Sequence, residues 1–220
     1  MANRKTTKKY YFTVEGETEQ WYLKWLEELI NATAEATYKV SFDCPIQKNP
    51  LKRAKSMTIT RRTDIYHLSD YESDDPIHVK EFMNTMDNMK AAKNSGKQIT
   101  YKFGYSNLTF DLWMILHKND CNSGLAHRSQ YITHINRAFC ESFEDMHQYK
   151  KEKNFKRCLS KLQLSDVRCA INRAKNIMET NENNGYILHQ YKGFKYYKEN
   201  PSLMIWEPIE NILKDCGIIE

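Results

Sequence analysis

Four short stretches of the chain carry the apolar patterns of β-strands. They cover residues 10–14, 38–44, 65–68 and 98–103. The first, Tyr-Tyr-Phe-Thr-Val, is entirely aromatic or β-branched, which is typical of a buried strand. The second and fourth alternate apolar with polar positions, which puts their apolar side chains on one face. The pattern therefore predicts four strands in the first half of the chain.

Other segments repeat apolar residues at the three- and four-residue spacing of a helix. After Thr18, the predicted N-cap, one helix face carries Trp21, Tyr22, Trp25, Leu26, Leu29 and Ile30. Further helices are expected at residues 50–62 and 77–94, and from Asp111 onward. The helix that starts at Asp111 is very apolar, and we expect His117 on it to be structural.

The alternating order of these elements predicts an α/β fold. A βαβαβαβ series forms a Rossmann-like, mostly parallel sheet with helices on both faces. We expect residues 10–125 to form this core, after a basic arm at residues 1–9. Residues 126–220 show helical spacing and little strand pattern. They are expected to form a helical, basic C-terminal extension packed on the core.

Composition narrows the class of protein. Of 220 residues, 40% are hydrophobic and 28% charged, enough for a packed core, and the formal charge of +5 is only mildly basic. The six cysteines form no Cys-x-x-Cys pair, no signal-peptide core follows the basic start, and no run reaches the length of a membrane helix. We expect a reduced, cytoplasmic protein without a membrane anchor. Without a Walker motif, it should not hydrolyse ATP itself.

Glu15 stands at the carboxyl end of the first predicted strand, before Gly16 and the first helix. Ligands bind at this edge of open α/β sheets, and a carboxylate there can hold a divalent metal. Glu17 and Glu19 follow in the first helical turn. Two interpretations account equally well for Glu17 and Glu19: they offset the positive end of the helix dipole, or they have a functional role. The position of Glu15, in contrast, favours a functional role.

A second acidic group follows the third predicted strand. Asp70 and Glu72 lie two residues apart, and side chains at this spacing point to the same side of an extended chain. Their carboxylates can converge on one hard divalent ion such as Mg²⁺. A solvated acidic turn is the simpler interpretation of this group taken alone. Asp74 and Asp75 are expected to cap the following helix.

The residues after the fourth strand return the chain to the same edge of the sheet. Ser106 and Asn107 are expected to lie in a turn, with Asp111 at the head of the next helix. Asp111 could then meet Glu15 and Asp70 in one cleft. Offsetting the helix dipole is the alternative role for Asp111. Turn formation is the main expectation for Ser106 and Asn107, and substrate contact is the alternative.

Positive charge gathers in the extension. Residues 148–200 hold twelve Lys or Arg against five Asp or Glu, with aromatic residues interleaved. Such a surface suits contacts with nucleic-acid phosphates and bases. The candidate nucleic-acid-binding residues are Lys150, Lys151, Lys153, Lys156 and Arg157. Solvated helix faces explain the same pattern, and taken alone that interpretation is the stronger one.

Three motifs in this order resemble the RloB-like family. They are Val-Glu15-Gly-Glu-Thr-Glu19-x-x-Tyr, the strand end Asp70-x-Glu72, and a third motif, Ser-Asn-x-x-Phe-Asp111-x-Trp-x-x-x-His. The resemblance covers nearly the whole chain and includes the final Asn-Pro-Ser before the last helix. That family is a variant of the Toprim catalytic domain, so the resemblance implies a Toprim-like fold.

The resemblance also implies an activity, a cofactor and a partner. Such proteins are encoded beside an ABC- or OLD-type ATPase in bacterial anti-phage, abortive-infection systems such as AbiL. The chain would be a nuclease or effector under the control of that partner. In Toprim domains the first glutamate is the general acid/base or a metal ligand, and an Asp-x-Asp pair holds Mg²⁺. These roles carry over to Glu15, Asp70 and Glu72, with Asp111 as a further candidate.

The chain departs from the family pattern at three positions. Glu72 stands where a second Asp is usual, Asp111 where Glu is usual, and Leu108 where proline is common. The exchanges between Asp and Glu keep the charge but change the reach of the carboxylate by roughly 1.5 Å. That change matters for Mg²⁺, which demands near-octahedral geometry.

Two functions are compatible with these patterns. The first is a Mg²⁺- or Mn²⁺-dependent nuclease that cleaves RNA, including tRNA, or DNA. The second is a catalytically weak Toprim scaffold that acts as a binding or regulatory subunit of the ATPase, and the exchanged acids give it some weight. Either form is compatible with an oligomer. Secondary site candidates are Glu19, Ser106 and Asn107.

Overall fold

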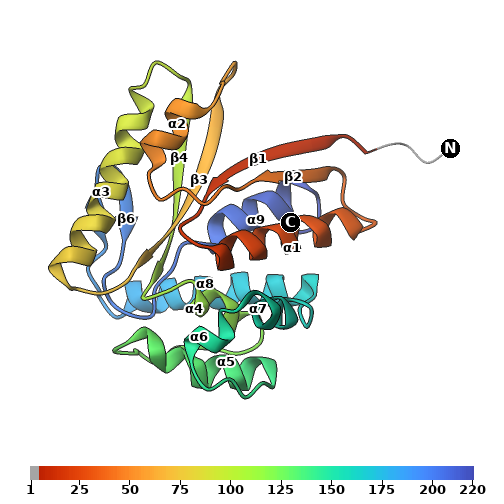
Figure 1. Ribbon diagram of the computed structural model, residues 1–220, viewed down its shortest axis with the longest axis vertical. Helices are drawn as coiled ribbons and strands as arrows, with labels where there is room; N and C mark the ends of the chain where they lie inside the picture. The colour runs from red at the N-terminus through yellow and green to blue at the C-terminus, as the bar shows by residue number, and fades with distance from the viewer. Residues whose placement is uncertain (1–4) are drawn as a thin grey trace.

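A four-stranded sheet in the order β2-β1-β3-β4 forms the centre of the molecule (Figure 1). This computed structural model describes residues 5–220. The strands are β1 (Thr7–Thr13), β2 (Lys39–Asp43), β3 (Thr63–Tyr71) and β4 (Ile99–Asn107). Every pairing in the sheet is parallel. The predicted α/β class is therefore confirmed, and all four carboxyl ends lie at one edge.

Nine α-helices surround the sheet within residues 5–220. They are α1 (Glu17–Ala32), α2 (Pro50–Ser56), α3 (Pro76–Lys93), α4 (Asp111–Leu116), α5 (Tyr131–Phe139), α6 (Met146–Tyr149), α7 (Glu152–Leu159), α8 (Leu164–Asn183) and α9 (Trp206–Asp215). A short 3₁₀ helix (Arg128–Gln130) precedes α5. Among the described residues, no helix has the length and apolar character needed to cross a membrane.

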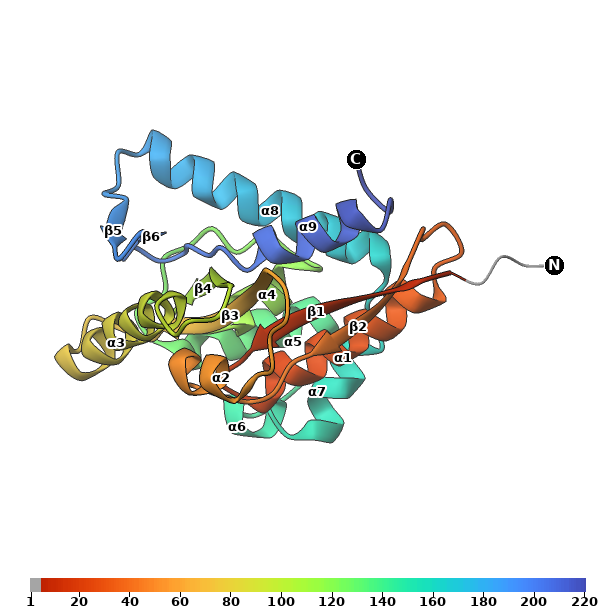
Figure 2. The same ribbon diagram turned by 90° about the horizontal axis from the view of Figure 1, so that it is seen from above.

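The two faces of the sheet carry separate hydrophobic clusters. Phe12 belongs to the larger cluster, which includes side chains of α9, whereas Ile65 belongs to the second cluster, with side chains of α2 and α3. Neighbouring residues of a strand point to opposite faces. Because Phe12 pairs with Tyr66, the residue after Ile65, the two clusters lie on opposite faces. Figure 2 shows α9 and α2 on opposite sides of β1.

Helix α1 protects the open edge of the sheet at β2. The Asn31 side chain forms two hydrogen bonds with the backbone of Val40, at 2.9 and 2.7 Å. Glu27 accepts from the backbone N–H of Phe42 at 3.1 Å. These bonds satisfy the backbone groups that β2 does not share with β1. An edge strand capped in this way cannot pair with another chain.

The extension packs closely on the sheet. Leu203 forms an antiparallel bridge with Ser106 at the end of β4, and the hydroxyl of Tyr10 on β1 donates to Asp215 of α9 at 2.9 Å. The prediction of a helical extension is wrong at one place, where the chain forms an antiparallel hairpin of β5 (His189–Tyr191) and β6 (Phe194–Tyr196). Phe194 of this hairpin packs edge-on against Phe103 of β4.

Two predicted boundaries in the first half are wrong. Strand β1 begins at Thr7, so residues 7–9 belong to the sheet and not to a basic arm; residues 1–4 of that arm lie outside the described part. Helix α2 ends at Ser56 instead of residue 62. The Lys97 ammonium donates to the carbonyls of Ala54, Lys55 and Met57, at 2.6 to 2.9 Å. The last carbonyls of a helix have no partner within the helix. At the end of α2, the Lys97 ammonium supplies that partner.

The predicted turn after the fourth strand is also displaced. Strand β4 continues through Ser106 and Asn107, which pair with Asp70 and Tyr71 of β3. The chain turns instead at Leu108, whose φ of 63° is left-handed. The predicted N-cap of α1 is wrong as well. Gly16 occupies that position, and the Thr18 hydroxyl donates to Glu19.

Candidate active site

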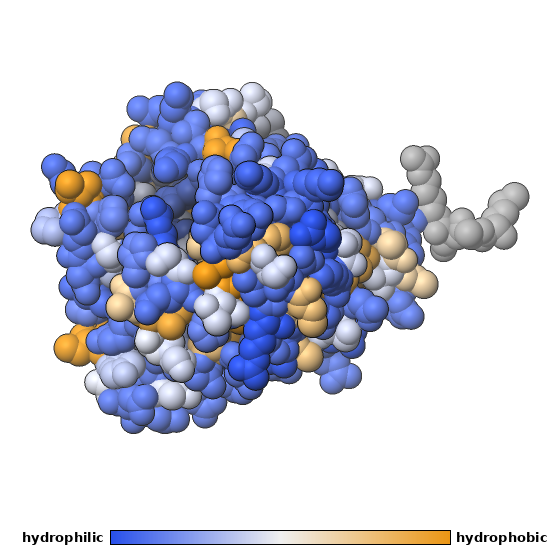
Figure 3. All heavy atoms as spheres, turned by 60° about the horizontal axis from the view of Figure 1, so that its bottom comes forward, coloured by the Kyte–Doolittle hydropathy of each residue, from blue (hydrophilic) through white to orange (hydrophobic). Residues whose placement is uncertain are grey.

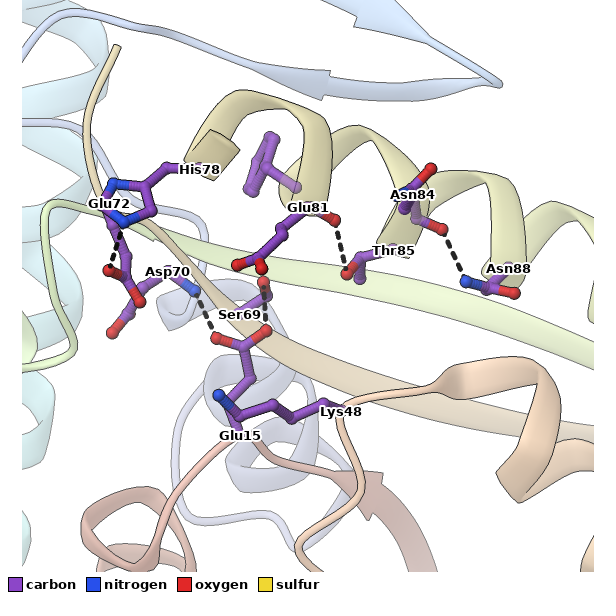
Figure 4. Close-up of a pocket in the computed structure, with 11 residues that line it drawn as sticks. Glu15, Lys48, Ser69, Asp70, Glu72, His78, Glu81, Asn84, Thr85 and Asn88 are labelled. Carbon is purple, nitrogen blue, oxygen red and sulfur yellow. Dashed lines mark hydrogen bonds and ion pairs between the residues drawn. The ribbon is translucent and has the colours of Figure 1, made fainter. Parts of the chain in front are cut away.

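Glu15 follows β1 at the carboxyl edge of the sheet, beside the end of β3. Its Oε1 accepts a hydrogen bond from the Ser69 hydroxyl at 2.9 Å, and its Oε2 accepts from the backbone N–H of Asp70 at 3.3 Å (Figure 4). Burial, aided by the charge of Glu19, raises the pKa of Glu15 to about 7, although both hydrogen bonds oppose the shift. Glu15 can therefore exchange a proton near neutral pH.

Asp70 occupies the next position of β3 after Ser69. The alternation of a strand directs Asp70 and Ser69 to opposite faces, so Asp70 does not share the hydroxyl that holds Glu15. Burial and the charges of Glu19, Glu15 and Asp111 raise the pKa of Asp70 well above its usual range. Acids from three strand ends are therefore close enough to influence one another, as the order of the strands predicted.

Asp111 begins α4 and is completely buried. Its Oδ2 accepts from the Thr109 hydroxyl at 2.8 Å and lies 2.9 Å from the Lys150 ammonium. Its Oδ1 has no hydrogen-bond partner among residues 5–220. A buried carboxylate oxygen without a partner is costly. Oδ1 is therefore available to a ligand or ion that enters the site.

Glu19 is the fourth acid of the group, and it lies 5% exposed on α1. Burial raises its pKa, and the charge of Asp111 acts in the same direction, while Lys150 opposes it. A Cβ atom at Gly16 would lie 3.1 Å from Oε2 of Glu19. The glycine thus leaves room for this carboxylate. Burial among other acids favours a functional role for Glu19 over dipole compensation, which would need only an exposed position.

Lys150 is the site residue whose acidic surroundings the sequence did not reveal. We expected it on a nucleic-acid surface, but its ammonium lies against Asp111 and Thr109. Burial disfavours its charged form, yet the carboxylates of Asp111, Asp70 and Glu19 outweigh that effect and raise its pKa. No local pattern distinguishes Lys150 from Lys151, because only the packing of α6 brings it to the acids. We call the four acids Glu15, Glu19, Asp70 and Asp111 the carboxylate cluster.

Glu72 lies apart from the ion pair at Asp111. Strand β3 ends at Tyr71, so the two-residue alternation that would align Glu72 with Asp70 stops there. The Glu72 carboxylate instead lies 3.5 Å from both His78 and Arg128. The prediction that Glu72 and Asp70 share a ligand therefore requires the Glu72 side chain to turn away from these partners.

Ser106 and Asn107 are both buried. The Asn107 amide donates to the carbonyls of Lys198 and Glu199, at 2.5 and 3.2 Å, and its backbone N–H donates to Ser202. Asn107 thus attaches the extension to β4. The Ser106 hydroxyl has no hydrogen-bond partner within the described chain.

Most of the predicted nucleic-acid-binding cations have acidic neighbours. Lys156 pairs with Glu152 at 2.6 Å, and Arg157 pairs with Glu141 at 2.7 Å. Lys151 and Lys153 are exposed. The molecular face in Figure 3 is largely hydrophilic and carries only small apolar groups. The exposed cations remain candidates for phosphate contacts, whereas Lys150 points into the carboxylate cluster.

A cleft of about 270 Å³ opens beside Glu15 (Figure 4). Strand β3 contributes Ser69 and Asp70 to its wall, and Lys48 approaches from the loop before α2. The opposite wall is a polar stripe of α3 that consists of His78, Glu81, Asn84, Thr85 and Asn88, with Phe82 beside it. The cleft gives solvent and a polar ligand access to Glu15.

The carboxylate cluster offers the oxygen donors that Mg²⁺ and Mn²⁺ prefer. The crowded acids and the unpartnered Oδ1 of Asp111 fit a cation in chemical type. Within residues 5–220, however, no group of three or more His, Cys, Asp or Glu side chains is already arranged to hold a metal ion. Binding an ion would therefore require side-chain rotation. Glu15, Asp70 and Glu72 line the same cleft, and Glu19 and Asp111 lie close enough to raise the pKa of Asp70.

Comparison with known proteins identifies a family. The family model described as RloB-like protein matches residues 10–212, which is most of the chain. No curated protein matches the chain, and no solved structure does. The match spans the strands, the carboxylate cluster and the extension through most of α9, as the three motifs indicated. The chain therefore belongs to the RloB-like protein family.

Proposed function

We propose that this protein is a metal-dependent nuclease in which Glu15 is the general base. The observation that carries the proposal is a group of buried acids at the carboxyl edge of the sheet, where burial, reinforced by the charge of neighbouring acids, raises the pKa values of Glu15, Asp70 and Glu19. Strongly shifted acids beside a cleft are typical of active sites.

Glu15 suits the transfer of one proton. A pKa of about 7 lets its carboxylate accept a proton near neutral pH and release it afterwards. Ser69 and the Asp70 backbone N–H hold the carboxylate in one orientation. In the proposed reaction, Glu15 takes a proton from the water that attacks phosphorus. The bond between phosphorus and the leaving oxygen then breaks, that oxygen takes a proton from solvent, and Glu15 returns its own proton to solvent.

Asp70 and Glu19 would hold a Mg²⁺ or Mn²⁺ ion beside Glu15. When bound, the ion would supply the positive charge that activates water and stabilises the leaving oxygen. Asp111 would contribute through its free Oδ1. Glu72 would join only after leaving Arg128 and His78. The exposed cations of the extension would contact the phosphates of RNA or DNA.

Membership of the RloB-like family and the resemblance to Toprim nucleases support a role in bacterial anti-phage defence. We propose that an ABC- or OLD-type ATPase controls the chain. The test is phage challenge of cells that carry the ATPase with wild type, Glu15→Ala or Asp70→Ala. Loss of protection in both variants, at equal protein levels, supports the proposal.

A second candidate function is a binding subunit of the ATPase without cleavage. It is favoured by the pairing of Lys150 with Asp111, which partly neutralises the carboxylate cluster without a metal. On this alternative, both alanine variants would protect cells as well as wild type and would still co-purify with the ATPase.

Cleavage itself is tested with end-labelled RNA and DNA in Mg²⁺ or Mn²⁺, using the ATPase complex. We expect Glu15→Gln to lower the rate by roughly 10²–10⁴-fold, the usual contribution of a general base. Glu17→Gln is the matched control, because Glu17 is exposed on the same turn. Equal rates for wild type and Glu15→Gln would refute the proposed role of Glu15.

A further inference from the structure

Lys150 holds an unusual position for a surface cation. It follows α6 directly, and its side chain is 37% exposed, whereas its partner Asp111 is 0% exposed. The pair Lys156–Glu152, also in the extension, is 54% and 60% exposed. Lys150 therefore reaches from the surface to a buried carboxylate. Because its side chain keeps access to solvent, the ammonium can leave without unfolding the core.

The segment that carries Lys150 is held firmly. The preceding residue, Tyr149, is fully buried, and its ring packs against Phe155 of α7 with centroids 5.5 Å apart. The Phe155 ring in turn packs against the Trp21 ring of α1, with centroids 5.8 Å apart. These contacts place the Lys150 backbone beside α1 and α4. The packing of the extension therefore fixes the backbone from which the Lys150 side chain reaches Asp111, while the side chain itself can rotate away.

An ammonium and a divalent ion make the same demand on this site. Both need carboxylate oxygens, and Oδ2 of Asp111 already contacts Lys150 at 2.9 Å. Like charges a few ångströms apart repel strongly where water is scarce. The ammonium and the metal ion would therefore not share Asp111 at full occupancy. One positive charge must leave when the other arrives.

We propose that Lys150 is the resident cation of the carboxylate cluster and that a divalent ion binds there in competition with it. Lys150 then sets the affinity of the site for metal and holds the Asp111 carboxylate in place when no metal is bound. It is a positioning residue and does not touch the substrate. The inference rests on the proposed function, because it assumes that the cluster binds a divalent ion.

The first test is calorimetric titration of the purified chain with Mn²⁺ at pH 8. We expect Lys150→Met to bind Mn²⁺ at least about tenfold more tightly than wild type, because a neighbouring positive charge is removed. Lys151→Met is the matched control, since Lys151 is adjacent but exposed, and it should bind as wild type does. Lys150→Arg keeps the positive charge, so it should bind Mn²⁺ as weakly as wild type does.

Equal or weaker affinity of folded Lys150→Met would overturn the role of Lys150 while leaving the proposed metal site intact. Absence of Mn²⁺ binding in wild type and in Lys150→Met would refute the role of Lys150 and the proposed metal site together.

A second measurement uses wild type alone, in case Lys150→Met does not fold. The rate at which an amine-reactive reagent acetylates Lys150, followed by mass spectrometry, should rise several-fold when Mn²⁺ is added. The acetylation rate of Lys151 should stay constant. An unchanged rate at Lys150 would overturn the competition.

Discussion

The Ser69 hydroxyl donates a 2.9 Å hydrogen bond to Oε1 of Glu15, across the boundary between β3 and the end of β1. This bond joins two residues that are 54 positions apart in the chain. It stabilises the charged form of Glu15, whereas burial stabilises the neutral form. The balance of the two leaves the pKa of Glu15 near 7, where it can serve as a base.

Removing this hydroxyl should make Glu15 a poorer base at neutral pH. In Ser69→Ala the carboxylate loses one hydrogen bond to its charged form, so we expect its pKa to rise by up to about one unit. The acid limb of the pH–rate profile for cleavage should move up with it. NMR titration of the Glu15 carboxyl carbon measures the same shift without activity. Ser56→Ala, at the exposed end of α2, should leave both curves unchanged.

Glu15→Gln should stabilise the fold at alkaline pH. The folded-state pKa of Glu15, about 7, lies above its ordinary value of 4.5, so the folded state binds the proton more tightly than the unfolded state does. The stabilisation from Glu15 is complete below pH 4.5 and is lost as pH rises to 7. The free energy of unfolding of the variant, relative to that of wild type, should therefore be about 3 kcal/mol higher at pH 8 than at pH 4.5. Urea unfolding at the two pH values measures this, and the same gain in Glu17→Gln would contradict the explanation.

Asn107→Ala should affect stability and leave the chemistry unchanged. The Asn107 amide attaches the extension to β4 through two carbonyls, and their loss should cost about 1–3 kcal/mol in free energy of unfolding. The folded fraction should cleave at the wild-type rate. Asn172→Ala, on the exposed side of α8, should change neither quantity. A strong loss of cleavage at full stability would show instead that Asn107 contacts the substrate.

His117 should contribute to acid sensitivity. It is buried between the Tyr22 hydroxyl, at 3.2 Å from Nε2, and the Trp113 carbonyl, at 2.9 Å from Nδ1. Burial lowers the pKa of His117 from 6.5 to about 4. Its proton is therefore bound more tightly in the unfolded state, and stability falls as pH drops from 6.5 toward 4.

In His117→Gln this part of the pH dependence should disappear. We expect the loss of stability between pH 7 and pH 5 to be smaller than in wild type by about 1–2 kcal/mol, even if the variant is less stable at pH 7. Urea unfolding at the two pH values checks the difference. An identical pH dependence in both proteins would rule out His117 as the source.

Local sequence pattern was enough to predict the sheet and the edge at which the candidate site lies. The aromatic and β-branched run before Glu15, and the helical spacing after it, specify a strand followed by a helix whatever the surroundings. Short connections between parallel strands leave few topologies. The sequence thus determined that Glu15, Asp70 and Asp111 would come to one edge of an α/β sheet. It also identified the family, since its three motifs lie in the segment that the RloB-like model matches.

Tertiary structure alone decided how that edge is charged. Glu19 is buried because α1 turns it inward, and Glu72 leaves the alternation of β3 and reaches Arg128, 56 positions away. Lys150 meets Asp111 only because α7 packs on α1 and α6 packs on α7. Burial and distance between remote residues set pKa values, and no local pattern encodes either. The sequence by itself placed the acids at one edge, and the packing of the extension decided which of them are buried, which are paired, and where their counter-charge lies.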